Sequence, residues 1–225
     1  MKYKNVFIGS ISALAGILLV ILVLVNCILV QESFLNYTNQ KYSVEKNLSM
    51  TESDLKDVVH AMVSYVKGKT DSPQIKVEIK GNEVDFFNKK EIGHLEDVRI
   101  LIRNIYIAML AMCIVSVAGV GYLVYKKDYS AMRKGVLFAW MLMLLVSVLV
   151  GILAIIDIDI VVTGFHQIFL SGSKWVLNPA LDRSVWMFRT FMYKDVVLVL
   201  GGIVAGVAAI TIVPVVLIGK RKNIA

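Results

Sequence analysis

The sequence predicts an α-helical membrane protein with four transmembrane helices, and two observations carry this prediction. Hydrophobic residues make up 57% of the 225-residue chain, above the roughly 45–50% that is typical of soluble domains. The chain also holds four runs without a charged residue, each long enough as a helix to cross about 30 Å of hydrocarbon. These predicted spans are residues 6–30, 104–125, 136–156 and 196–218. We expect residues 1–225 to form a single membrane domain.

The distribution of basic residues predicts how the four spans are oriented. An even number of spans places both termini on one side, and basic residues in short flanks favour the cytoplasmic side. The side of the termini carries a single acid, Asp128, against these basic residues: Lys2, Lys4, Lys126, Lys127, Arg133, Lys134, Lys220, Arg221 and Lys222. We therefore expect cytoplasmic termini and two extracytoplasmic loops, residues 31–103 and 157–195. The net charge of +7 then reflects topology, and no nucleic-acid partner is expected.

The first predicted loop contains the pattern of a small α+β cap. After Thr51, a good helix N-cap, apolar residues recur at helical spacing until Lys67-Gly68-Lys69, where we expect the helix to end. These apolar residues are Leu55, Val58, Val59, Met62, Val63 and Val66. Residues 75–80 and 83–87 alternate apolar and polar side chains around Gly81-Asn82. This pattern predicts a β-hairpin whose two-residue turn is Gly81-Asn82.

A further helix is predicted to begin near Lys90 and to continue into the second span. Glu91, His94 and Asp97 are spaced by three residues, so they lie on one face of such a helix. The same face continues as the side of the helix that faces the bundle. We therefore expect His94 at the outer mouth of the bundle, with a carboxylate one turn away on either side.

The second predicted loop contains another histidine in an unusual setting. Residues 164–175 are aromatic and punctuated by glycine, and they include His166 and Trp175. Asn178-Pro179 then predicts a helix start. The residues that follow, Leu181 to Tyr193, are too few to span a membrane and too apolar to be fully hydrated. We therefore expect them to form an interfacial helix, which includes Trp186.

Several of these segments resemble the lipoprotein intramolecular transacylase family of Gram-positive bacteria. The resemblance rests on two histidine-centred segments and on residues downstream of them: Glu91–Val98, Phe165–Phe169, Trp175 and Asn178–Asp182. The layout of four spans and two outer loops matches as well. One departure is visible, because Phe188-Arg189-Thr190-Phe191 stands where a Phe-Pro-Glu type of segment is expected. This departure affects the expected shape of the interfacial helix more than the histidine pair.

The resemblance implies an acyltransferase that works on a single substrate molecule. The sn-2 acyl chain of a diacylglyceryl-modified N-terminal cysteine would move to the α-amino group of the same cysteine, which gives a lyso-form lipoprotein. The family's two functional histidines correspond here to His94 and His166. We expect His166 to carry protons between the reacting groups, because an imidazole titrates near neutral pH. His94 would orient the substrate or stabilise the oxyanion.

Other side chains are expected to support this pair. Glu91 or Asp97 would set the tautomer of His94. The lipid would be lined by aromatic residues and one acid: Phe165, Trp175, Asp182 and Trp186. No cofactor and no metal are expected. The partners would be diacylglyceryl-modified lipoproteins and membrane lipid, and the protein would act as a monomer in the bacterial cytoplasmic membrane, with its active site on the extracytoplasmic face.

Two other classes of function remain open from the residues alone. His94 and His166, with Asp97 and Glu91, could instead bind a metal ion in a membrane metalloenzyme or metal-binding protein. Alternatively, the chain could be a membrane scaffold without enzymatic activity, whose outer hairpin recruits a partner. The two cysteines, Cys27 and Cys113, both lie within apolar runs and indicate neither a disulfide nor a metal pair.

Overall fold

The computed structural model describes residues 2–170 and 172–221, and it divides into two compact units. The described part of the first unit consists of residues 2–25, 106–155 and 199–221, and we call it the membrane unit. The second consists of residues 26–105 and 156–198, apart from residue 171, and we call it the loop unit because it contains both predicted loops.

Four helices among the described residues are long and apolar enough to cross a membrane. They are α1 (Lys2–Ile28), α5 (Lys89–Tyr125), α6 (Tyr129–Ile156) and α8 (Thr190–Arg221). The four predicted spans fall on these helices, except that α1 ends two residues before its predicted span does. The protein is therefore an integral membrane protein that crosses the bilayer several times, as its composition predicts.

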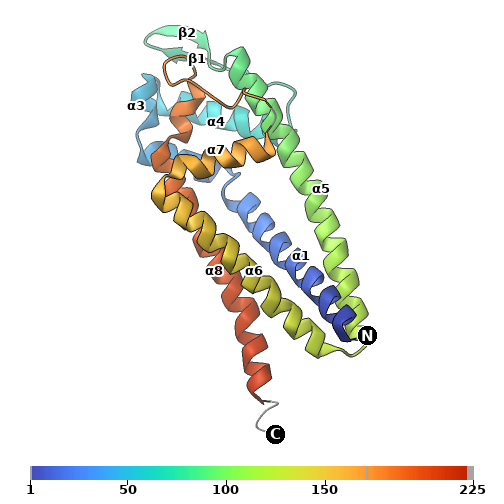
Figure 1. Ribbon diagram of the computed structural model, residues 1–225. Helices are drawn as coiled ribbons and strands as arrows, with labels where there is room; N and C mark the ends of the chain where they lie inside the picture. The colour runs from blue at the N-terminus through green and yellow to red at the C-terminus, as the bar shows by residue number, and fades with distance from the viewer. Residues whose placement is uncertain (1, 171, 222–225) are drawn as a thin grey trace. The chain divides into compact units, whose positions relative to one another are not determined.

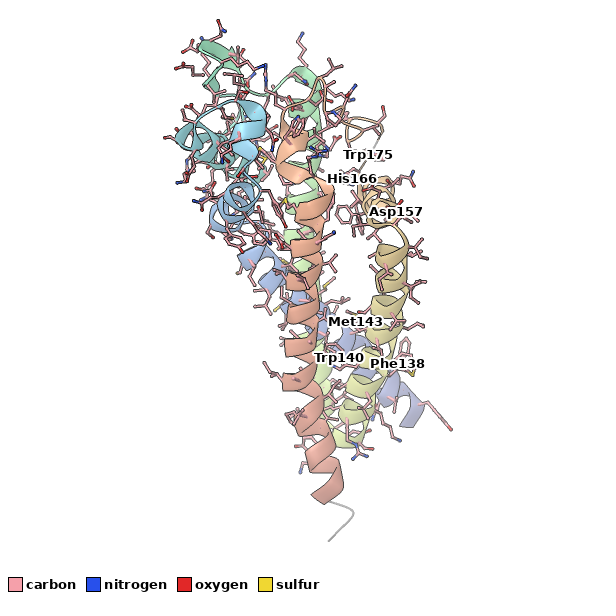
Figure 2. All side chains as sticks on the ribbon, turned by 90° about the vertical axis from the view of Figure 1, so that its left-hand side faces the viewer. Phe138, Trp140, Met143, Asp157, His166 and Trp175 are labelled. Carbon is pink, nitrogen blue, oxygen red and sulfur yellow. The ribbon has the colours of Figure 1, made fainter. Side chains whose placement is uncertain are left out.

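Within the membrane unit, α1 lies between α5 and α6 (Figure 1). Glycines make this approach possible: a Cβ atom at Gly119 would lie 1.7 Å from Ser12 Oγ, and one at Gly135 would lie 2.3 Å from the carbonyl carbon of Gly9. Small residues at such positions let helix backbones come close together. On α6, Trp140 points toward α8 (Figure 2), where its Nε1 donates a hydrogen bond to Thr211 Oγ1 at 2.7 Å.

The first part of the loop unit is built around α4 (Glu52–Val66), which follows α2 (Glu32–Lys41) and α3 (Val44–Leu48). The predicted helix is confirmed, because Thr51 Oγ1 accepts a hydrogen bond from the Asp54 backbone N–H and Gly68 has a φ of 76° after the last turn. All six residues of the predicted apolar stripe are buried. The helices α2 and α3 were not predicted.

The β-hairpin is present, but its turn is shifted by one residue from the prediction. Strands β1 (Lys76–Ile79) and β2 (Asn82–Asp85) pair antiparallel, with Ile79 opposite Asn82. The turn residues are therefore Lys80 and Gly81, with φ angles of 52° and 79°. A tight hairpin turn with two left-handed residues favours glycine in its second position, so Gly81 ends the turn and Asn82 begins β2.

The hydrophobic core of the loop unit lies where the hairpin meets α4. Phe86 and Phe87 follow β2, are at most 1% exposed, and pack edge to face with ring centroids 4.9 Å apart. Val58 and Val59 of α4 are fully buried in the same cluster. This core anchors the chain immediately before α5 begins.

The second predicted loop has a different structure from the one expected. Residues 158–169 form a helix, α7 (Ile158–Phe169), capped by Asp157, whose side chain accepts a hydrogen bond from the Asp159 N–H. The interfacial helix predicted from Asn178 is absent from its expected place. That segment contains a turn and the short 3₁₀-helix η1 (Ser184–Phe188), and α8 begins at Thr190. The Asn178 side chain closes a local turn by accepting from the Ala180 N–H at 2.9 Å, so it does not cap a helix.

Candidate functional site

All of the predicted site residues belong to the loop unit, and the first turns of α5 provide its most firmly held part. Asn88 caps the helix: its Oδ1 accepts from the N–H groups of Lys90 and Glu91 at 2.9 and 3.0 Å. Glu91 Oε2 accepts in return from the Asn88 N–H at 2.8 Å. This reciprocal arrangement is a capping box. It fixes the start of the helix one turn before His94.

Glu91 has a structural role in addition to capping. The residue is 1% exposed, and its second oxygen, Oε1, accepts from the backbone N–H of Ser184 at 2.6 Å. Both carboxylate oxygens are thus engaged by backbone donors. Glu91 therefore ties η1 to the start of α5.

Asp182 is also buried within the structural framework and does not line an open surface. It is 4% exposed, and its two oxygens accept from the Asn178 N–H at 2.6 Å and from Asn88 Nδ2 at 2.7 Å. Lys90 Nζ lies 3.9 Å from the same carboxylate. These contacts fasten the chain after α7 to the start of α5. Asp182 therefore has a supporting role at the start of α5.

His94 lies on α5 with its ring against that of His166. The ring centroids are 5.8 Å apart and the ring planes are inclined by 29°, so the two imidazoles stack. His94 Nδ1 is buried and has no hydrogen-bond partner among the described residues. Burial first, and the nearby His166 second, lower the pKa of His94 to about 4, and Asp97 opposes this shift. His94 is therefore a neutral imidazole at neutral pH.

His166 lies in the last turn of α7, one helical turn after Val162. Its Nδ1 is 2.7 Å from the carbonyl oxygen of Val162. A carbonyl oxygen can only accept a hydrogen bond, so Nδ1 must carry the proton. In the neutral ring, the lone pair is then on Nε2. The backbone of α7 itself thus leaves His166 with a basic nitrogen that this hydrogen bond does not use.

Aromatic side chains surround His166. Trp175 lies beside it (Figure 2), with ring centroids 5.1 Å apart, and Trp175 Nε1 donates to the Gly172 carbonyl at 3.0 Å. Phe165 packs edge to face on His166 at 5.8 Å and lies 4.9 Å from Phe169. Phe165 and Phe169 are both exposed. The predicted aromatic environment of His166 is therefore present, and it has an accessible apolar side.

Asp97, one turn after His94, forms an ion pair with Lys174 that the sequence did not predict. Lys174 Nζ is 3.2 Å from Asp97 Oδ1. The lysine side chain passes over Gly93, where a Cβ atom would lie 3.1 Å from Lys174 Cδ. Asp97 therefore pairs with a lysine from the loop after α7 and does not hydrogen-bond the buried Nδ1 of His94. Only the tertiary fold brings Lys174 to α5, so no local sequence signal could have indicated it.

Among the predicted site residues, His94, His166, Phe165 and Trp175 are brought together through direct ring contacts. Trp186 packs against the hydrophobic core of the loop unit, and its Nε1 donates to the Pro179 carbonyl at 3.1 Å. Arg189 lies over its ring, 4.5 Å from the centroid. Trp186 thus supports the segment around η1.

A metal site was the main alternative use of the two histidines. Within residues 2–170 and 172–221, no group of three or more His, Cys, Asp or Glu side chains is arranged to hold a metal ion. The carboxylates nearest in sequence, Glu91 and Asp97, are engaged by backbone donors and by Lys174. The site therefore has the character of a stacked histidine pair in an aromatic setting.

Comparisons with known proteins agree on one family. The family model described as lipoprotein intramolecular transacylase Lit matches residues 10–191. The crystal structure of this transacylase from Bacillus cereus superposes with a TM-score of 0.79 at 14% sequence identity, over 100% of both chains. Two variants of the same protein, with a histidine replaced by arginine or alanine, give TM-scores of 0.72. Both variants are 14% identical in sequence to this chain. The matches cover 100% of this chain and 94% and 96% of the arginine and alanine variants, respectively.

No match was found among curated proteins. At 14% identity, the solved structures establish the fold. The family model covers both histidine-centred segments and most of the chain. The protein therefore belongs to the lipoprotein intramolecular transacylase family, and it is an acyltransferase of the membrane.

Proposed function

We propose that this protein transfers the sn-2 acyl chain of a diacylglyceryl-modified lipoprotein to the α-amino group of its N-terminal cysteine. The observation that carries this proposal is the contact between His94 and His166, whose ring centroids are 5.8 Å apart. The two histidine-centred segments lie far apart in the sequence, and both belong to the part of the chain that matches the transacylase family. Their meeting provides two imidazoles for one reaction centre.

His166 is the better candidate for the group that moves protons. Its Nδ1–H is committed to the Val162 carbonyl, so Nε2 can accept a proton from the attacking nitrogen. Starting from the neutral amine, the new C–N bond forms at the ester carbonyl and the C–O bond to glycerol breaks. One proton passes from the nitrogen, through His166 Nε2, to the leaving glycerol oxygen. The same imidazole thus acts first as the base and then as the acid.

His94 is suited to stabilise the charge that develops on the carbonyl oxygen. Its lowered pKa, about 4 and due first to burial, keeps the ring neutral at neutral pH. A neutral imidazole can donate one N–H, and Nδ1 is a buried nitrogen without a partner among the described residues. A buried polar atom with unused hydrogen-bonding capacity requires an explanation. An oxyanion in the transition state would satisfy it.

The tethered substrate supports a mechanism without an acyl-enzyme. Donor ester and acceptor amine belong to the same molecule, and well-oriented intramolecular reactions reach effective molarities of roughly 10⁵–10⁸ M. The protein then mainly has to fold the substrate into the attack geometry and manage protons. The exposed Phe165 and the half-buried Trp175 beside His166 provide apolar surface against which acyl chains can pack.

We place the reaction at the extracytoplasmic face of the bacterial cytoplasmic membrane, with the protein acting as a monomer. The support for this orientation is the concentration of basic residues around the termini and the connection between α5 and α6. The partners would be lipoproteins that carry the diacylglyceryl group, together with the surrounding lipid. No cofactor is part of the proposed mechanism.

The proposal is tested with purified protein in lipid nanodiscs and a synthetic diacylglyceryl lipopeptide with a free N-terminus. Mass spectrometry of fragment ions distinguishes an N-acyl lyso-form product from the starting diacyl form, although their masses are equal. We expect conversion by the wild-type protein, and a loss of at least about 100-fold for His166→Ala and for His94→Ala. The matched control is His60→Ala, because His60 is exposed and pairs only with Glu32 among the described residues.

Conversion by the wild-type protein that survives both histidine substitutions would refute the assignment of the pair. No conversion by the wild-type protein would refute the acyl transfer itself. In cells, the lipoprotein N-termini should likewise change from the diacylglyceryl form to the lyso form when the protein is produced. A His60→Ala variant should produce the same change as the wild-type protein.

A further inference from the structure

Next to the histidine pair, a carboxylate on α5 already holds an ammonium group. Asp97 follows His94 by three residues, and its Oδ1 is 3.2 Å from Lys174 Nζ. Lys174 directly precedes Trp175, whose ring packs on His166 at 5.1 Å. Lys174 therefore links the segment beside His166 to the helix that carries His94. The attacking group of the proposed reaction is also an ammonium group before it loses its proton.

The two partners of this ion pair differ in exposure. The Asp97 side chain is 16% exposed and the Lys174 side chain is 48% exposed. A carboxylate that is largely removed from water requires a cation or several hydrogen-bond donors nearby. A lysine that is half exposed loses little when it returns to water, because exposed ion pairs contribute little to stability. Asp97 thus needs a positive partner more than Lys174 needs a negative one.

The approach to Asp97 is kept open by a glycine. A Cβ atom at Gly93 would lie 3.1 Å from Lys174 Cδ and 3.6 Å from Cε. The lysine chain therefore lies close to the helix backbone, and a side chain at residue 93 would require it to shift. Lys174 Cδ, Cε and Nζ thus follow one path along the helix surface to Asp97. The path also passes one residue before His94.

We propose that Asp97 binds the α-ammonium group of the substrate's N-terminal cysteine, and that Lys174 occupies this position when substrate is absent. The inference rests on the proposed acyl transfer and adds to it the place where the acceptor nitrogen is received. Lys174 returns to solvent when the substrate ammonium replaces it. The bound ammonium releases one proton to solvent, and the resulting amine attacks the ester with His166 as its proton acceptor. Asp97 is an ammonium-binding residue in this scheme and takes no proton itself.

A purely structural ion pair and an ammonium-binding site predict different effects of substitution. If the pair only fixes the loop after α7, then Asp97→Asn and Lys174→Met should both weaken the enzyme in the same way. If Asp97 receives the substrate, the two substitutions act in opposite directions. Asp97→Asn should raise KM about tenfold, whereas Lys174→Met should lower KM severalfold because an internal competitor is removed.

Binding measurements make the test independent of turnover. In the His166→Ala background, affinity is measured for a diacylglyceryl lipopeptide with a free amine and for its N-acetylated counterpart, which carries no ammonium. The protein with Asp97 intact should bind the free-amine lipopeptide about five- to tenfold more tightly than the N-acetylated one. Lys174→Met should increase this preference. Asp97→Asn should abolish it. The matched control is Lys90→Met, which removes a lysine that binds the Val176 carbonyl in the same loop and should leave the preference unchanged.

A charge-exchanged variant covers the case in which the single substitutions disturb the loop. Asp97→Lys combined with Lys174→Asp rebuilds an ion pair between the same two positions. A structural role predicts that this double variant recovers the KM of the wild-type protein. The ammonium-binding role predicts no recovery, because position 97 then carries a positive charge.

The inference is overturned if the free-amine preference persists in Asp97→Asn, or if the charge-exchanged variant regains wild-type KM. Failure of the acyl transfer has a different signature. In that case the wild-type protein forms no lyso product, while the binding comparison between the two lipopeptides still reports on Asp97. The two outcomes are therefore separable within one set of variants.

Discussion

The two sides of the histidine pair are held in place in different ways. At the start of α5, Glu91 is 1% exposed and Asp182 is 4% exposed, and the four oxygens of these two carboxylates accept hydrogen bonds. On the other side, α7 contains no buried residue, and His166 is held mainly by ring contacts and by its own helix. The stabilising interactions are therefore concentrated beside His94, whereas the side that would carry protons has few contacts to lose if it moves.

The largest expected difference between the two sides concerns stability. Glu91→Ala removes the acceptor for the Asn88 and Ser184 N–H groups, and Ser184 is buried. The free energy of unfolding should fall by about 3 kcal/mol, because a buried donor is left without a partner. Chemical unfolding in detergent measures this loss. Glu96→Ala, an exposed position on the same helix, is the control, and an equal effect of both substitutions would contradict the comparison.

The second expected difference is a pH dependence of stability that arises on the α5 side, from His94. The pKa of His94 is lowered to about 4, first by burial, while an unfolded histidine titrates near 6.5. Between these values, the unfolded state binds a proton that the folded state does not. Stability should therefore decrease as the pH falls from about 6.5 to 4, and this contribution should level off below pH 4. His94→Gln should show a shallower decrease over this range, and parallel curves for the two proteins would rule out the lowered pKa.

On the α7 side, substitution should affect turnover with little effect on stability. Trp175 packs on His166 at 5.1 Å but is only partly buried. Trp175→Ala should lower kcat about tenfold through poorer placement of His166 and of the acyl chain, without a marked change in the unfolding midpoint. Trp175→Phe should retain most of the activity. A large loss of stability in Trp175→Ala would show that this side is as firmly fixed as α5.

The smallest effect is expected at the residue after His166. Gln167 is exposed on α7, and surface substitutions away from special contacts usually change stability by less than about 0.5 kcal/mol. Gln167→Ala should therefore match the wild-type protein in both unfolding and lipopeptide conversion. A measurable loss of conversion would mean that the outer face of α7 contacts the substrate.

The features that were predicted from the sequence depend on local patterns. The four spans follow from the length of the charge-free runs, and α4 follows from the Thr51 cap with its apolar stripe, all of which the structure confirms. The hairpin was predicted with its turn one residue late. Asn88 and Glu91 form a capping box that the sequence also displays, so this structural role of Glu91 follows from a local pattern as well.

The features that were missed depend on contacts between distant segments. Asn178 has the residue type of a helix cap, but Asp182 binds back to Asn178 and across to Asn88, and this holds the segment in a turn. The Lys174–Asp97 pair joins residues 77 positions apart. The contact between His94 and His166 could not be predicted from either segment, because spacing within one helix carries no information about a second helix.

The hydrogen bond from His166 Nδ1 to the Val162 carbonyl has a consequence for how this enzyme family can vary. Donor and acceptor are one turn apart on the same helix, so the tautomer of His166 is fixed within α7 and does not depend on another element. The helix can shift, tilt or acquire new neighbours, and Nε2 still presents its lone pair. In many enzymes a separate carboxylate fixes the tautomer of the catalytic histidine, and the fold must hold that carboxylate at hydrogen-bonding distance from the ring. Here a peptide group performs this task, and no side-chain mutation can delete that acceptor.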